Sequence, residues 1–166
     1  EEMGEAFDIE REDLDRLIRL AERRAYARHH PVPACGDIMS KDVIAIAEEA
    51  SPQEARNLLL DRGLRSLPVV DGDGLVAGMV GLRDLTHEAP RVADLMSKPV
   101  FATPEQLVLD LLDPLTDGRH HAAVIIDSGG KLLGLVTQTD LLVAISRLAL
   151  SGAMAEPDTV ETPSKV

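Results

Sequence analysis

The chain has 166 residues, a net charge of −12 at pH 7 and a hydrophobic content of 45%. Binding to nucleic acid or to an anionic membrane surface needs clustered Lys and Arg, so this acidity argues against both partners. Aromatic residues make up only 2% of the chain, and its one cysteine, Cys35, excludes an intrachain disulfide. We therefore expect an aliphatic core and a reducing, cytoplasmic compartment.

The first predicted element is a long amphipathic helix over residues 7–29. Its apolar residues recur at helical spacing and form one stripe, which we expect to cover an apolar surface. The stripe consists of Leu14, Leu17, Ile18 and Ala21. Residues 1–33 are thus interpreted as a helix and linker that precede the rest of the fold.

From residue 34 onward the chain repeats itself. The segment Asp37-Ile38-Met39-Ser40-Lys41 returns as Asp94-Leu95-Met96-Ser97-Lys98. A fixed internal period indicates a repeat architecture, so we predict two copies of one unit, over residues 34–90 and 91–150. Small units bury a low fraction of their surface, and we expect the copies to pack on each other around a pseudo-twofold axis. Later landmarks recur at an offset of 56 residues: Asp71 and Asp127, Gly78 and Gly134, Asp84 and Asp140.

Each copy is predicted to have the order β-α-β-β-α, which is an α+β fold. Strands are expected to start near Val43 and Val100. Helices should then begin at Ser51-Pro52-Gln53-Glu54 and at Thr103-Pro104-Glu105-Gln106, where a hydroxyl, a proline and an acid or amide form a capping sequence. We expect Gly63 to end the first of these helices and Pro114 to end or kink the second.

The second half of each copy is predicted to be a β-hairpin followed by another helix. Apolar runs before Asp71 and Asp127 indicate buried strands, and the glycines that follow suit tight turns. The second helices are expected over about residues 82–88 and 138–150. Residues 151–166 are rich in Pro, Thr, Glu and Ser, and we predict a disordered tail.

These features resemble the cystathionine β-synthase (CBS) domain pair, also called a Bateman module, over residues 34–150. The resemblance rests on the leading Asp-Ile-Met-Ser-Lys motif, on the strand Pro68-Val69-Val70-Asp71, and on the junction Gly134-Leu135-Val136-Thr137-Gln138-Thr139-Asp140. It implies a regulatory module, not an enzyme, that binds AMP, ADP or ATP in a cleft between the repeats. It also implies a homodimer.

The leading helix carries a second resemblance. Its segments Phe7-Asp8-Ile9 and Glu22-Arg23-Arg24-Ala25-Tyr26 are similar to the region preceding the CBS pair in HPP-family integral membrane proteins. This resemblance implies that the chain is the cytoplasmic tail of a longer protein with a transmembrane domain, where it would regulate transport.

The strand-to-helix junction at Thr137 is the first candidate ligand site. A helix amino terminus attracts phosphate, the Thr137 hydroxyl suits a hydrogen bond to it, and the Asp140 carboxylate suits the hydroxyls of a ribose. The resemblance implies the same contacts. The alternative is a capping motif worth about 1 kcal/mol that needs no ligand. In the first copy Gly81 replaces the threonine, so we expect the cleft around Asp84 to be degenerate or empty.

Four further residues are candidate ligand contacts. Arg65 and His121 each lie six residues before a strand-ending aspartate, and the resemblance implies that this position meets phosphate; the alternative is a solvated loop charge. Val100 and Phe101 are candidates for packing against a purine; the alternative for Phe101 is a core position, where such a residue is more often found.

The sequence shows no catalytic signature. It contains no Gly-x-Ser-x-Gly, phosphate-binding loop or His-Glu-x-x-His motif. A metal site is not expected, because the adjacent histidines of His29-His30 and His120-His121 point apart on a helix or strand. Two rivals to a nucleotide sensor remain: a dimerisation module without a physiological ligand, which Gly81 favours, and an enzyme whose chemistry comes from a partner domain.

Overall fold

The computed structural model describes residues 11–153, which form two compact units divided after Val32. The first unit contains α1 (Arg11–His29), whose first turn is acidic and whose last turn is basic, as the helix dipole favours. Residues 7–10 of the predicted helix lie outside the described residues. No residue of α1 is buried, and Leu14, Leu17 and Ile18 are 50%, 55% and 47% exposed. The idea that this stripe covers an apolar surface stays a prediction.

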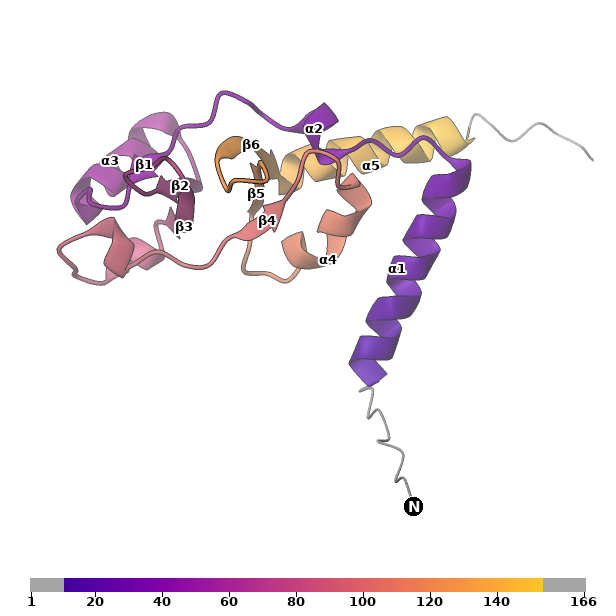
Figure 1. Cartoon of the computed structure of the whole chain (residues 1–166), viewed down its shortest axis with the longest axis horizontal. Helices are drawn as coiled ribbons and strands as arrows, with labels where there is room; N and C mark the ends of the chain where they lie inside the picture. The colour runs from indigo at the N-terminus through magenta and orange to yellow at the C-terminus, as the bar shows by residue number, and fades with distance from the viewer. Residues whose placement is uncertain (1–10, 154–166) are drawn as a thin grey trace, which may run out of the picture. The chain divides into compact units, whose positions relative to one another are not determined.

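The second unit contains two three-stranded sheets of identical topology (Figure 1). In each sheet the first strand is parallel to the second, and the second is antiparallel to the third. The two copies even share a register shift, between Val69 and Val70 and between Ile125 and Ile126. The predicted α+β repeat is therefore confirmed. The strands are β1 (Ile46–Ala47), β2 (Ser66–Val70), β3 (Val76–Gly81), β4 (Val100–Ala102), β5 (Ala122–Ile126) and β6 (Leu132–Thr137).

The hairpin turns form for the reason that the sequence indicates. Asp71 Oδ1 accepts hydrogen bonds from the backbone N–H groups of Asp73 and Leu75, both at 2.9 Å. Asp127 repeats this arrangement at the second turn. Gly74 has φ +80° and Gly130 has φ +87°, a conformation that side chains with a Cβ rarely adopt.

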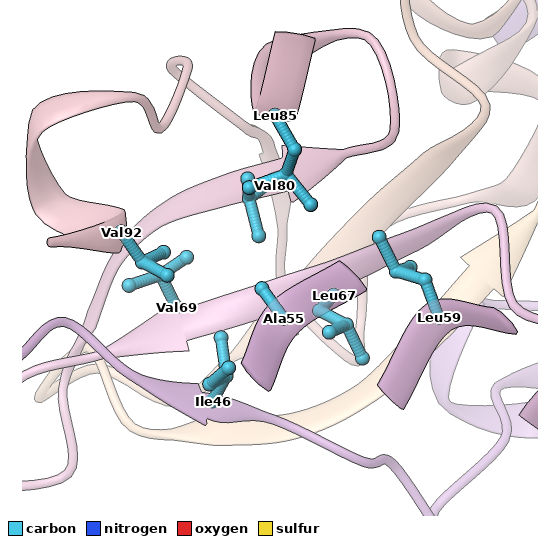
Figure 2. Packing of buried hydrophobic residues seen from close by; sticks show 8 residues of the cluster. All are labelled: Ile46, Ala55, Leu59, Leu67, Val69, Val80, Leu85 and Val92. Carbon is cyan, nitrogen blue, oxygen red and sulfur yellow. The ribbon is translucent and has the colours of Figure 1, made fainter. Parts of the chain in front are cut away.

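The first repeat is built around α3 (Pro52–Arg62), which begins at the predicted capping box. Ser51 Oγ accepts from Glu54 N at 3.2 Å, and Ser51 N donates to Glu54 Oε2 at 2.8 Å. Gly63, with φ +61°, ends the helix as predicted. Figure 2 shows how the helix packs its apolar face on the sheet. The buried cluster consists of Ile46, Ala55, Leu59, Leu67, Val69, Val80, Leu85 and Val92.

The helix predicted to begin at Thr103-Pro104 is wrong. The chain instead forms a 3₁₀ helix, η3 (Val108–Leu111), that continues as α4 (Leu112–Leu115), with Pro114 inside it. The reason is competition for backbone groups from the segment leading into α2 (Cys35–Ile38). Gly36 N donates to Pro104 O at 2.8 Å, Cys35 N donates to Gln106 O at 2.7 Å, and Val108 N donates to Pro33 O at 3.1 Å. These bonds use the groups that a helix from Pro104 would need.

The predicted second helix of the first repeat is reduced to a 3₁₀ turn, η1 (Asp84–Thr86). Thr86 Oγ1 donates back to Arg83 O at 2.8 Å, and Pro90 disfavours helical backbone at the residue before it. A second 3₁₀ turn, η2 (Val92–Asp94), follows. The first strand also starts later than expected, at Ile46 instead of near Val43.

The last helix, α5 (Gln138–Ala153), confirms the predicted helix at 138–150 and runs three residues beyond it. The prediction of a disordered tail over 151–166 is therefore wrong for residues 151–153. Residues 154–166 lie outside the described residues.

The leading motif of each repeat packs on the sheet of the other repeat. Ser40 exchanges two backbone hydrogen bonds with Leu135, and Ser97 does the same with Met79, all between 2.8 and 3.0 Å. A Cβ on Gly134 would lie 2.7 Å from Met39 Sδ, so the strand needs glycine there to let the methionine approach. A Cβ on Gly78 would likewise lie 2.5 Å from Met96 Sδ. The two repeats thus exchange their first segments, which explains why motif and glycine recur together.

Candidate ligand-binding cleft

Two cavities open beside the strand-to-helix junctions, each lined by the junction of one repeat and by the loops before β2 and β5. The first, here the Asp84 cavity, has a volume of about 350 Å³ and lies at the junction after β3. The second, the Thr137 cavity, has a volume of about 290 Å³ and lies at the junction after β6. Arg65 and His121 line both cavities, so the two are halves of one cleft.

The sheet register brings these residues together. Arg65 comes immediately before β2 and His121 immediately before β5. The antiparallel pairs Ser66 with Gly81 and Ala122 with Thr137 set each of them beside a strand-to-helix junction. The structure therefore brings Arg65, His121, Asp84 and Thr137 to one cleft, as the sequence interpretation requires.

At the second junction, Thr137 and Asp140 form a complete helix cap. Asp140 Oδ2 accepts from Thr137 N at 2.9 Å and from Thr137 Oγ1 at 2.8 Å, and Asp140 N donates to Thr137 Oγ1 at 3.2 Å. Thr137 lines the Thr137 cavity, whereas Asp140 is not among its lining residues. The capping role is thus present, and the role of Asp140 toward a ligand stays a prediction.

At the first junction, the aspartate is less engaged. Asp84 Oδ2 accepts from Gly81 N at 2.7 Å, and Asp84 lines the larger cavity. A Cβ on Gly81 would lie 3.1 Å from Arg65 O, so a threonine like the one at 137 would require that carbonyl to move by a few tenths of an ångström. The expectation of a degenerate cleft at this junction stays a prediction, but space for a ligand exists here.

Three cationic or titratable residues of the Asp84 cavity were not predicted as ligand contacts from the sequence: Arg83, Arg119 and His120. They lie in the first copy's junction and in the loop before β5, and only the fold brings these segments together. The residues 56 positions away are Thr139, Gly63 and Leu64, so the repeat pattern does not mark these three positions as a matched set.

The loop that carries Arg119 is held in shape by Asp117. Its Oδ1 accepts from His120 N at 2.9 Å and from Arg119 N at 2.7 Å, and its Oδ2 lies 2.7 Å from His120 Nδ1. These backbone hydrogen bonds, to His120 and then Arg119, lower the pKa of Asp117 to about 2, with a smaller contribution from the His120 ring. The carboxylate therefore stays ionised and orders the rim of the cavity at neutral pH.

Comparison with known proteins identifies the repeats. The family model of the CBS domain matches residues 35–91 and again residues 92–147. The chain belongs to the CBS domain family. The pair of CBS domains predicted from the sequence is thereby confirmed, and the HPP resemblance stays a prediction.

Relatives of this CBS pair include an enzyme and two solved CBS-pair structures. Inosine-5'-monophosphate dehydrogenase of Thermoplasma acidophilum is 35% identical over 108 residues, which are 63% of this chain but only 22% of the dehydrogenase. CBSX2 in complex with AMP has a TM-score of 0.64 and 22% identity, covering 70% of this chain and 98% of that chain. The CBS domain of a bacterial CNNM/CorC family Mg²⁺ transporter in complex with ATP has a TM-score of 0.61 and 23% identity, covering 69% and 87%. At these identities the two structures show the shared fold.

Gln138 connects the last helix of the CBS pair to the cleft. Its Nε2 donates to Leu115 O at 2.6 Å and to His120 O at 3.3 Å, and its backbone N donates to His121 O at 3.0 Å. The first turn of α5 is therefore tied to the loop that lines the cavities.

The structure does not bring Val100 and Phe101 to the cleft. Neither lines either cavity, and Phe101 lies on β4 opposite Val124 with 41% of its surface exposed. The alternative of a core position for Phe101 is wrong as well.

The remaining reactive groups do not form a second site. Burial, reinforced by nearby Asp110, raises the pKa of the Cys35 thiol to about 11 and keeps it neutral. Among residues 11–153, no group of three or more His, Cys, Asp or Glu side chains is placed to hold a metal ion. Nor does this part of the chain contain a helix long and apolar enough to cross a membrane.

Proposed function

We propose that this CBS pair is a regulatory module that binds an adenosine nucleotide in the cleft between its repeats. The observation that carries the proposal is the convergence of Arg65, Arg83 and Arg119 on one cavity of a chain whose net charge is −12. Guanidinium groups bind phosphate oxygens through paired, charge-assisted hydrogen bonds. Asp84 lies beside them and is a suitable acceptor for ribose hydroxyls. CBSX2 bound to AMP and the transporter domain bound to ATP support this ligand class.

Binding would act by changing the geometry of the two repeats. A ligand shifts such an equilibrium only through unequal affinity for the two arrangements. The bonds of Gln138 supply a route from the cleft to α5. Exposed Leu142, Val143 and Leu150 on α5, at 65%, 44% and 67%, suit contact with a second copy, so we propose a homodimer as the working unit. If the HPP resemblance holds, the output is regulation of an attached membrane transport domain.

Isothermal titration calorimetry with AMP, ADP and ATP, paired with thermal unfolding, tests the proposal. At a concentration of about 100 Kd, a ligand specific for the folded state stabilises it by about 2.7 kcal/mol. We expect a clear rise in Tm with at least one nucleotide and a smaller rise for Arg65→Gln, which removes the cation shared by both cavities. The matched control is Arg147→Gln, an exposed arginine on α5 that lines neither cavity.

The second candidate function is a dimerisation module without a physiological ligand. The completed cap of Thr137 and Asp140 favours it, because Asp140 Oδ2 already accepts from both the backbone N–H and the hydroxyl of Thr137. No heat and no thermal shift with any of the three nucleotides would decide for this alternative. An enzymatic role would need chemistry from another domain, and a screen for hydrolysis of the bound nucleotide tests it.

A further inference from the structure

The two cavities can be compared position by position, because the residues that line them are related by the repeat. Arg65 in the first copy corresponds to His121 in the second, and both side chains line both cavities. The other cationic residues are not matched in this way. The Asp84 cavity has Arg83 where the Thr137 cavity has Thr139, and Arg119 where the other has Gly63. The cleft is therefore symmetric in its backbone and asymmetric in its charge.

This asymmetry matters most for ligands that carry several phosphates. Arginine stays protonated at any physiological pH, and each phosphate added to a ligand adds charge that needs a local cation. The acidic chain as a whole opposes such a ligand, but charges farther away than about 8 Å are largely screened at physiological salt. Affinity for a polyphosphate thus depends on the arginines within the cavity itself.

We propose that the Asp84 cavity is the site for nucleotides with two or more phosphates, and that the Thr137 cavity accepts at most a nucleoside or its monophosphate. This inference rests on the proposed function and assigns different ligand classes to the two halves of the cleft. Arg83, Arg119 and Arg65 hold the phosphate chain, while Asp84, whose Oδ2 is bonded to Gly81 N, has its second carboxylate oxygen for the ribose.

Because Arg65 lines both cavities, a ligand in one cavity affects binding in the other. A polyphosphate in the Asp84 cavity takes up Arg65, the one arginine that also lines the Thr137 cavity. The Thr137 cavity then keeps no arginine for a second polyphosphate. The chain therefore binds one ATP, and bound ATP weakens binding of a monophosphate in the other half.

Transposing the charge between the copies tests the inference. Arg83→Thr and Thr139→Arg each place the residue of one copy at the equivalent position of the other, and both positions are exposed. Calorimetry with AMP and ATP is performed at fixed ionic strength on each variant and on the double variant. Arg119→Gln serves as an independent removal of charge, and Arg147→Thr controls for the change in net charge. Circular dichroism melts verify that every variant is folded.

We expect one ATP per chain, a tenfold or greater loss of ATP affinity in Arg83→Thr and in Arg119→Gln, and less than a threefold change for AMP. Thr139→Arg is expected to create a second ATP site, and the double variant to restore ATP binding at the Thr137 cavity. Three outcomes would overturn this inference alone. They are equal losses of affinity for AMP and ATP, an unchanged ATP affinity in both arginine variants, and two equivalent ATP sites in the unaltered chain. Absence of binding by every nucleotide would overturn the proposed function with it.

Discussion

Replacing Gly134 by alanine probes the exchange of leading segments between the repeats. The added Cβ would lie 2.7 Å from Met39 Sδ and 2.8 Å from Ser40 O, whereas ordinary van der Waals contact begins at 3.4 Å. The overlap is thus about 0.7 Å, and Ser40 belongs to a backbone bridge with Leu135 that would have to separate. Overpacking and a weakened hydrogen bond together predict a loss of about 1–3 kcal/mol in the free energy of unfolding.

Urea unfolding monitored by circular dichroism measures this loss, with two other glycines as references. Gly78→Ala is expected to cost less than Gly134→Ala, because all of its close contacts are atoms of the flexible Met96 side chain. Gly72→Ala meets no atom within 4 Å and does not have a positive φ, so we expect it to be neutral or up to about 1 kcal/mol stabilising. If Gly134→Ala is as stable as Gly72→Ala, the exchanged contact is not packed as described.

Three further substitutions have defined outcomes. Ser51→Ala removes the α3 capping box and should cost about 1 kcal/mol in urea unfolding, whereas an unchanged midpoint would show that the cap is dispensable. Leu59→Ala, at a side chain that is 1% exposed, should cost about 2–5 kcal/mol; a loss below 1 kcal/mol would contradict the packing of Figure 2. Asp117 has its pKa lowered from 3.8 to about 2 in the folded chain, so its stabilisation is present above pH 4 and is lost as the pH falls through about 2. Acid titration of unfolding should therefore show a steeper loss of stability between pH 4 and 2 in the native chain than in Asp117→Asn, and parallel curves would refute this assignment.

Local signals in the sequence predicted those parts of the fold whose hydrogen bonds are local. The capping box of α3 and the turns after Asp71 and Asp127 form as expected, because each satisfies its own backbone groups within a few residues. The equally strong signal at Thr103-Pro104 failed, since the backbone of residues 33–36 takes those carbonyls from a distant part of the chain. Local helix propensity carries no information about competition from backbone groups far away in the sequence.

The candidate site likewise contains residues that the sequence predicted and residues that only the fold brings together. Arg65, His121, Asp84 and Thr137 were predicted because the repeat and the family resemblance both indicate them, and the structure gathers them at one cleft. Arg83 and Arg119 were not predicted, since their importance arises only when segments of different repeats meet. Phe101 lies on β4 and lines neither cavity, so its contact with a purine stays a prediction.

Nuclear magnetic resonance of the ¹⁵N-labelled chain during titration with ATP tests the central claim most directly. A nucleotide in the cleft between two facing repeats should shift the amide signals of Arg65, Gly81 and Arg119 together, with one binding curve describing residues of both copies. Shifts confined to a single repeat, or none at saturating ATP, would contradict a shared cleft that senses nucleotides.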